Sequence, residues 1–251
     1  MPATLTIADW TALAIFLIAW LFYEPLVETA GPPGRLIDTD MTVIRRAWMR
    51  NSVVRGSQFM DGQLLAQVLN TSTFFASSNL ILIAGAASTL FHGEESYETA
   101  ATLVAIKMSS RSLFEGQVGL IVLTLARGLL AFIWSIRQLH YCLAALGAAL
   151  PPGHRASAEP YADAIARLLN PALSSFNAGV RGYYFAGAAA MWLFGPWAFM
   201  GATIVAVALL FWRQKLSPAA AAIASIRAIL EETTVDPKSN QSTYQEKIHA
   251  E

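Results

Sequence analysis

Charged residues are scarce in this chain of 251 amino acids. Only 14% of the residues are Asp, Glu, Lys or Arg, whereas soluble domains average about a quarter. The scarcity is concentrated in a few long apolar runs, and 55% of the residues are hydrophobic, with a mean hydropathy of +0.45. This composition excludes an ordinary soluble domain. It predicts an all-α integral membrane protein, a bundle of about four transmembrane helices with cytoplasmic surface helices.

Other absences narrow the possible functions. The formal net charge is +0, so the basic footprint that nucleic acid requires is absent and no nucleic-acid partner is expected. The single cysteine, Cys142, excludes an internal disulfide framework. The sequence contains no phosphate-binding glycine loop, no nucleophile elbow and no zinc-protease motif. We therefore predict no catalytic residues and no cofactor, and an enzyme acting on a lipid is the weakest of the functions considered.

Two groups of metal-binding residue types carry little weight. His140 and Cys142 stand two residues apart, so on a helix their side chains point in different directions. His92 lies close to Glu94 and Glu95 in a short polar segment, which is more typical of a solvated loop than of a cation site. We therefore predict no metal site.

Four apolar stretches are predicted to cross the membrane within a bundle over residues 1–215: about 7–26, 64–91, 116–136 and 183–212. The last stretch is too long for one upright span and contains Gly195 and Pro196 near its middle. A kinked single helix and a broken, re-entrant helix are both open interpretations. Residues 216–251 are predicted to form a polar C-terminal helix and tail.

Two polar segments are predicted to be surface helices. One lies in the arginine-rich stretch between Arg35 and Arg55. It either packs on the bundle or lies in the headgroup layer with its arginines on lipid phosphates. The other covers residues 156–169 and is predicted to end at Asn170 and Pro171.

Basic residues predict the orientation, because short loops rich in Lys and Arg stay in the cytoplasm. The stretch from Arg35 to Arg55 carries five arginines, whereas the basic residues between the second and third spans are offset by three glutamates. The N-terminus is therefore predicted to lie outside. Four full spans would place the C-terminus outside too, and Arg213 and Lys215, directly after the last span, argue against that. A re-entrant last segment would remove the conflict.

Polar residues within the second span should avoid lipid, which offers them no hydrogen-bond partner. Asn70, Thr73 and Ser77 form a stripe at helical spacing, continued by Gly85 and Ser88. We predict that this stripe faces other helices. Helix packing is the simpler interpretation, and a path for a solute is the alternative.

Arg127 falls near the middle of the predicted third span. An arginine at that depth costs about 2.5 to 3.5 kcal/mol on insertion scales. We predict that it faces the bundle interior and hydrogen-bonds a Ser, Thr or Asn of the second span or a backbone carbonyl. A span shifted along this long helix would place it less deep.

Five polar residues stand at the predicted cytoplasmic ends of the third and fourth spans: Arg137, Tyr141, Asn177, Arg181 and Tyr184. If the two helices are antiparallel neighbours, these residues meet at one level. Few acids are nearby, so we predict a site for an anionic lipid headgroup, a solute or a partner. The alternative is a set of separate interfacial anchors, in which each arginine reaches for phosphates alone.

Three stretches carry a family resemblance: residues 74–78 (FFASS), 134–138 with 141–142 (WSIRQ and YC), and 176–185 (FNAGVRGYYF), followed by Pro196 and Trp197. Their order and spacing resemble the bacterial membrane-protein family catalogued as domain of unknown function 599, over about residues 7–215. The resemblance implies a small multi-spanning protein of the bacterial inner (cytoplasmic) membrane. It supplies no activity.

The function expected from these observations is that of a non-catalytic accessory or scaffold subunit of a membrane complex. It would dock through its small-residue helix faces on other membrane subunits or on itself. The alternative is a transporter or channel component for a small solute or ion, which would use the polar second span and act as an oligomer.

Overall fold

The computed structural model describes residues 5–29, 37–55, 58–91, 110–148 and 155–235. Every regular element in these ranges is helical, in the order α1 (Ile7–Thr29), α2 (Ile37–Arg55), α3 (Phe59–Phe91), α5 (Arg111–Gly147), α6 (Arg155–Ala190), a 3-10 turn η1 (Met191–Phe194), α7 (Pro196–Lys215) and α8 (Pro218–Val235). The predicted all-α class is confirmed.

Three helical stretches are long and apolar enough to cross a membrane: Phe59–Phe91, Arg111–Gly147 and Pro196–Thr233, the last of which joins α7 to α8. The apolar part of α1, Ile7–Tyr23, is shorter. The chain is therefore a helical membrane protein, in which three described stretches meet these criteria where about four spans were predicted.

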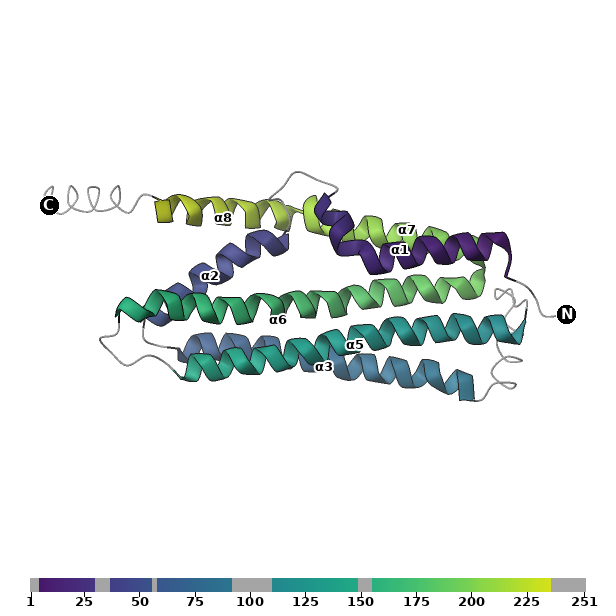
Figure 1. Ribbon diagram of the computed structural model, residues 1–251, viewed down its shortest axis with the longest axis horizontal. Helices are drawn as coiled ribbons and strands as arrows, with labels where there is room; N and C mark the ends of the chain where they lie inside the picture. Colours follow the sequence, from purple (N-terminus) through teal and green to yellow (C-terminus); the bar gives the residue numbers. More distant parts are fainter. Residues whose placement is uncertain (1–4, 30–36, 56–57, 92–109, 149–154, 236–251) are drawn as a thin grey trace, which may run out of the picture.

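Helices α3, α5 and α6 lie side by side along the length of the molecule, with α5 packed against both of the others (Figure 1). At one end, α1 and α7 pack on each other beside the end of α6, around a core that contains Phe16, Phe185 and Phe199. At the other end, α2 packs on α6 and α8, and a second core that contains Met49 and Leu139 lies between α2, α3, α5 and α6. The described residues thus form two hydrophobic cores, which the long helices connect.

Residues 183–212, predicted as one kinked or re-entrant span, belong to two helices that run in opposite directions (Figure 1). The chain reverses at Gly195, whose φ of 114° is easily reached only by glycine. Pro196 then begins α7, at a position where its missing N–H breaks no helical bond. The kinked-helix prediction is wrong because glycine followed by proline here ends one helix and starts the next.

The predicted end of a surface helix at Asn170 and Pro171 is also wrong, because α6 continues through both residues to Ala190. Proline inside a helix removes one backbone hydrogen bond. The carbonyl that loses this bond belongs to Arg167. Arg167 and Pro171 are both exposed, so this carbonyl lies toward the outside of the bundle. Meanwhile Leu169 and Ala172 are fully buried on the opposite face, and this packing holds the helix together.

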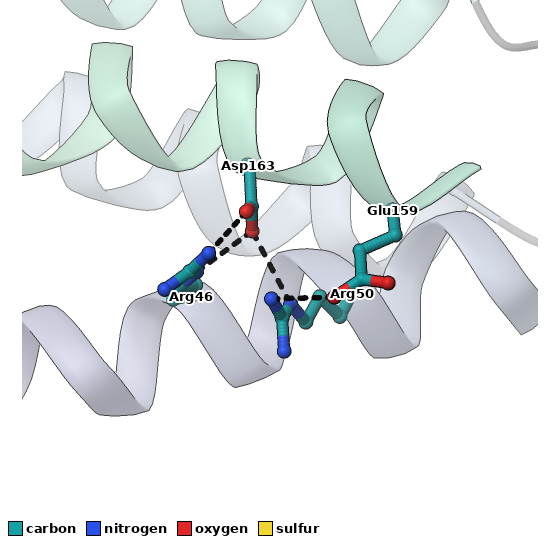
Figure 2. A network of polar contacts seen from close by, with 4 residues as sticks. All are labelled: Arg46, Arg50, Glu159 and Asp163. Atoms are coloured by element: carbon teal, nitrogen blue, oxygen red, sulfur yellow. Dashed lines mark hydrogen bonds and ion pairs between the residues drawn. The ribbon is translucent and has the colours of Figure 1, made fainter. Parts of the chain in front are cut away.

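Helix α2 is held on α6 by a network of ion pairs (Figure 2). Arg46 donates through Nε (2.8 Å) and Nη2 to the two carboxylate oxygens of Asp163. Arg50 donates through Nε to the same carboxylate (3.2 Å), and its Nη2 lies 2.7 Å from Glu159. The geometry favours the packed surface helix over one that lies in the headgroup layer, since these arginines meet carboxylates of the chain itself.

Other carboxylates fix the remaining sides of α2. The buried Asp61 of α3 accepts hydrogen bonds from Trp48 Nε1 (2.7 Å) and Ser52 Oγ (2.6 Å). On the opposite side, Arg227 of α8 donates to the buried Asp40 of α2 (2.7 Å). Helix α2 is therefore a bracket that joins α3, α6 and α8.

Substitution of Asp163 by Asn should loosen this bracket. Hydrogen bonds from Arg46 and Arg50 hold the pKa of the Asp163 carboxyl well below its usual range. A depressed pKa in the folded state gives stability that is present above the unfolded value of about 3.9 and is lost as the pH falls through the folded value. We expect Asp163→Asn to destabilise the detergent-solubilised protein at pH 7 by roughly 1 kcal/mol.

Thermal unfolding at pH 7 and at successively lower pH values measures this effect, and the Tm difference between variant and wild type should narrow below about pH 3. Glu159→Gln is the matched control, since it removes only a contact between Arg50 and an exposed carboxylate, and it should change Tm less. Equal Tm values for wild type and Asp163→Asn at pH 7 would show that the network does not stabilise the fold.

Candidate functional site

The candidate site is built where the backbones of α5 and α6 touch. A Cβ atom added to Gly182 would lie 3.2 Å from the Cα of Gly128, closer than side chains normally approach. A Cβ atom on Gly179 would lie 2.6 Å from the ring of Phe132. Glycine at positions 179 and 182 therefore allows this close crossing, because the facing helix and the Phe132 ring occupy the space next to a Cβ atom.

Helix α3 covers one side of this crossing with aromatic rings and polar groups. Phe75 stacks on Phe132 with 5.8 Å between ring centroids, and Tyr183 Oη donates to the Phe75 carbonyl (2.8 Å). Asn79 Nδ2 donates to the Leu125 carbonyl (3.0 Å). Several residues of the family-like stretches thus pack together at a junction of three helices, which gives them a structural role.

A pocket of about 140 Å³ lies on the other side, between α1, α5 and α6. Two arginines from different helices, Arg127 and Arg181, line it together with two aromatic residues of α1, Trp20 and Tyr23. The glycines of the crossing, Gly128 and Gly182, also line it. Among the described side chains of the lining, none is acidic.

Arg127 is held at the pocket by α1. Its Nη1 donates to the Trp20 carbonyl (3.2 Å), and its guanidinium carbon lies 5.0 Å from the centroid of the Trp20 ring. Helix α1 is kinked here, with φ and ψ of −109° and 16° at Phe22 and with Pro25 inside the helix. Pro25 lacks the N–H that would bond the carbonyl of Leu21, so the backbone opens next to Trp20.

The surroundings of Arg127 differ from the prediction in part. The structure gives it a backbone carbonyl of α1 as a hydrogen-bond partner, and within the described residues it bonds no side chain of the second span. Arg127 is exposed on the described chain, so it lies at the rim of the pocket and not inside the bundle. Its level corresponds to Trp20, near the end of the apolar part of α1, which supports the less deep position.

Arg181 reaches the same pocket from α6. Its guanidinium carbon lies 5.6 Å from the centroid of the Tyr23 ring, and Tyr23 Oη donates to Gln214 Oε1 of α7 (3.2 Å). One turn further along α6, Tyr184 Oη accepts a hydrogen bond from Arg213 of α7. The end of α7 is therefore level with the pocket.

The structure divides the five residues that were expected to form one cluster. Arg137 lies ten residues beyond Arg127 on α5, about 15 Å along the helix axis. It donates through Nε to Tyr141 Oη (2.6 Å), and both residues are exposed. Asn177 is half-buried on α6. Arg181 instead lies with Arg127, because the touching glycines set the register of α5 against α6; binding of an anion at Arg137 stays a prediction.

The predicted polar stripe of the second span lies on the outside of the described chain. Asn70, Thr73 and Ser77 are exposed, and so are Gly85 and Ser88. The polar residues that α3 buries are others: Ser72 and Asn79 lie on the face toward α5, and Asp61 lies near the start of the helix. The expectation that the stripe faces other helices is thus not met within this chain.

Sequence reasoning missed the contribution of α1. Trp20 and Tyr23 supply two walls of the pocket, although neither was among the predicted site residues. Pro25 was the available signal, because proline within a helix predicts a kink and freed carbonyls. For metal binding, no group of three or more suitable side chains occurs in the described ranges, and the predicted loop around His92 lies outside them.

Comparison with known proteins identifies a family whose function is unknown. The family model described as "Protein of unknown function, DUF599" matches residues 11–219. No curated protein and no solved structure matches the chain.

The glycine contact between α5 and α6 gives a test of how the pocket is built. Gly182→Leu should push the helices apart and lower the stability by about 1 to 3 kcal/mol, as overpacking generally does. Gly187→Leu is the matched control on the same helix, because Gly187 is exposed and has nothing within 4 Å of an added Cβ. The measurement is the Tm of both variants in one detergent, and equal Tm values would contradict the close contact.

Proposed function

We propose that this chain, which belongs to the family "Protein of unknown function, DUF599", is a non-catalytic accessory or scaffold subunit of a complex in the bacterial cytoplasmic membrane. The observation that carries the proposal is the exposed polar face of α3. In the apolar 18-residue segment of α3, 11% of the residues are buried within the chain. In the corresponding segment of α5, 33% are buried.

The composition of this face supports a protein partner within the membrane. Asn70, Thr73 and Ser77 alternate there with large exposed apolar residues such as Phe74 and Ile81. Hydrocarbon offers no partner to an amide or a hydroxyl, and such residues together with small ones are enriched where membrane helices meet. A helix of another subunit on α3 would satisfy both kinds of residue.

The order of the helices supports five crossings: α1, α3, α5, the C-terminal part of α6, and α7. With five crossings, Arg213 and Lys215 at the end of α7 lie on the same side of the membrane as α2 and its arginines. This agrees with the rule that segments rich in Lys and Arg stay in the cytoplasm. This removes the conflict that four spans created. On the cytoplasmic side, α2, α8 and the ends of the three long helices then form a layer that other proteins can contact.

Cysteine labelling tests this topology. In a Cys142→Ala background, single cysteines at the exposed residues Thr42 of α2, Ser112 of α5 and Thr233 of α8 report three positions. In intact cells, a membrane-impermeant maleimide should label position 112 and should reach 42 and 233 only after permeabilisation. Labelling of position 233 in intact cells, with position 42 protected, would contradict five crossings. Labelling of position 42 in intact cells would show that the orientation is the reverse of the proposed one.

Photo-crosslinking tests the partner. A photoreactive amino acid at Ser77 should crosslink to a different membrane protein, and that protein should copurify with the chain in mild detergent. The control position is Val205, an exposed residue of α7 outside the polar stripe, which should give no such product. A crosslink between two copies of the chain would favour the oligomeric transporter component instead. Lipid adducts alone at both positions would contradict a docked α3.

A further inference from the structure

An apolar groove lies between α1 and α5, at the end of the molecule where α6 turns back into α7 (Figure 1). Its volume is about 510 Å³, within the range of roughly 300 to 1,000 Å³ that is typical of small-molecule sites. Helix α1 packs mainly on α7 in the described chain, so the two sides of the groove stay apart. Unfilled space of this size loses van der Waals contacts, and an occupant restores them.

Leucines form most of the lining. Leu5 and Leu13 line the groove from the side of α1, and Leu113, Leu120 and Leu123 line it from α5. None of the described lining residues is charged. Because α1 and α5 are both apolar here, the groove lies in the part of the chain that crosses the membrane.

The buried Trp192 also lines the groove, and its polar groups already have partners. Its indole Nε1 donates to Asp9 (3.0 Å), and its carbonyl accepts a hydrogen bond from Gln117 (3.1 Å). The described lining therefore offers a ligand an aromatic ring, leucine side chains and one hydroxyl, that of Ser112 near the start of α5. A charged or strongly polar ligand would leave its own groups without partners there, so the groove selects an apolar one.

Gly116 and Gly119 create part of this space. They lie one turn apart on α5, and a Cβ atom added to either would meet nothing within 4 Å. This distinguishes them from Gly128 and Gly182, where an added Cβ atom would meet the facing helix. A side chain at position 116 or 119 would therefore occupy the groove without pushing helices apart.

The length of the groove separates two kinds of apolar occupant. Along α5 the lining runs from Ser112 to Leu123, which is roughly 16 Å of helix axis. The hydrocarbon core of a bilayer is about 30 Å thick, so the groove extends through about one leaflet. A membrane-spanning helix of a partner needs a groove through both leaflets. The acyl chain of a lipid extends through one leaflet only, which matches the groove.

We propose that this groove binds one acyl chain of a membrane phospholipid. The chain enters at the level of Ser112, close to the start of α5, and its methyl end lies near Leu123. The leucines and the Trp192 ring then contact it along its length. The choice of the outer leaflet rests on the topology under Proposed function, whereas the groove and the class of its ligand do not.

Photolabelling of the full chain in vesicles tests the proposal. The vesicles contain phosphatidylethanolamine and phosphatidylglycerol, with a trace of phosphatidylethanolamine that carries a diazirine midway along one acyl chain. Leu120 should collect about threefold more adduct than Ile204, the excess that a few additional van der Waals contacts give. Ile204 is the matched reference, because it is exposed on α7 at a similar distance from the start of its helix. Labelling of Leu120 at or below the level of Ile204 would overturn the proposal.

Filling the groove provides a second test. Gly119→Leu should lower the labelling of Leu120 to the level of Ile204, because the new side chain occupies the space of the acyl chain. Gly187→Leu is the matched control, an exposed glycine of α6 outside the groove with equally open surroundings, and it should leave the labelling of Leu120 unchanged. Unchanged labelling in Gly119→Leu would overturn the proposal. The comparison within the unaltered chain stands even where a variant fails to fold.

Native mass spectrometry of the chain purified in mild detergent identifies the occupant by its mass. One phospholipid retained by wild type and by Gly187→Leu, and lost from Gly119→Leu, agrees with the proposal. A copurifying protein that Gly119→Leu alone releases would assign the groove to a partner helix and overturn it. Leu120 without adduct in a chain that retains no lipid would show that protein fills the groove, with the same consequence. A failure of the Ser77 crosslink leaves these results untouched, so the two proposals fail separately.

Discussion

The structure depends on the contact between Gly128 of α5 and Gly182 of α6, because it brings two long helices together at backbone distance. On one side, the close approach lets the Phe132 ring cover Gly179 and stack on Phe75 of α3. On the other side, the same glycines leave the pocket that α1 closes. Side chains at this crossing would separate the helices and disturb both sides at once, so the aromatic junction and the pocket are two results of one constraint.

The reversal at Gly195 decides how the remaining helices join this frame. It places Trp192 at the end of α6, where the ring stacks on Phe199 of α7 and Nε1 donates to Asp9 of α1 (3.0 Å). Gln117 of α5 donates to the Trp192 carbonyl (3.1 Å), so both the backbone carbonyl and the indole N–H of Trp192 have partners. Trp192 therefore ties α1 and α7 to the turn through its indole and α5 through its backbone carbonyl, and α7 runs back along α1.

Local patterns in the sequence predicted some of this, and contacts between distant residues account for the rest. Long uncharged runs predict helices that cross a membrane, and they agree with α3 and α5. Gly195 and Pro196 were recognised as a break, but the sequence could not say whether the chain bends or turns back. Pro171 predicted an end to α6 because its effect on the backbone is local, while the packing that keeps the helix intact involves α5. The partner of Arg127 is 107 residues away, and no periodicity brings Trp20 to it.

The two groups of arginines show that a count of charges does not reveal how the fold uses each of them. The arginines of α2 pair with Asp163 and Asp61, so their charges are used within the fold. Arg127 and Arg181 are single basic residues within long helices and contribute little to a count. Yet Arg127 lies beside the Trp20 ring and Arg181 lies beside the Tyr23 ring, both on α1. A carboxylate neutralises the arginine that it pairs with, whereas the backbone carbonyl and the ring of Trp20 leave the charge of Arg127 in place.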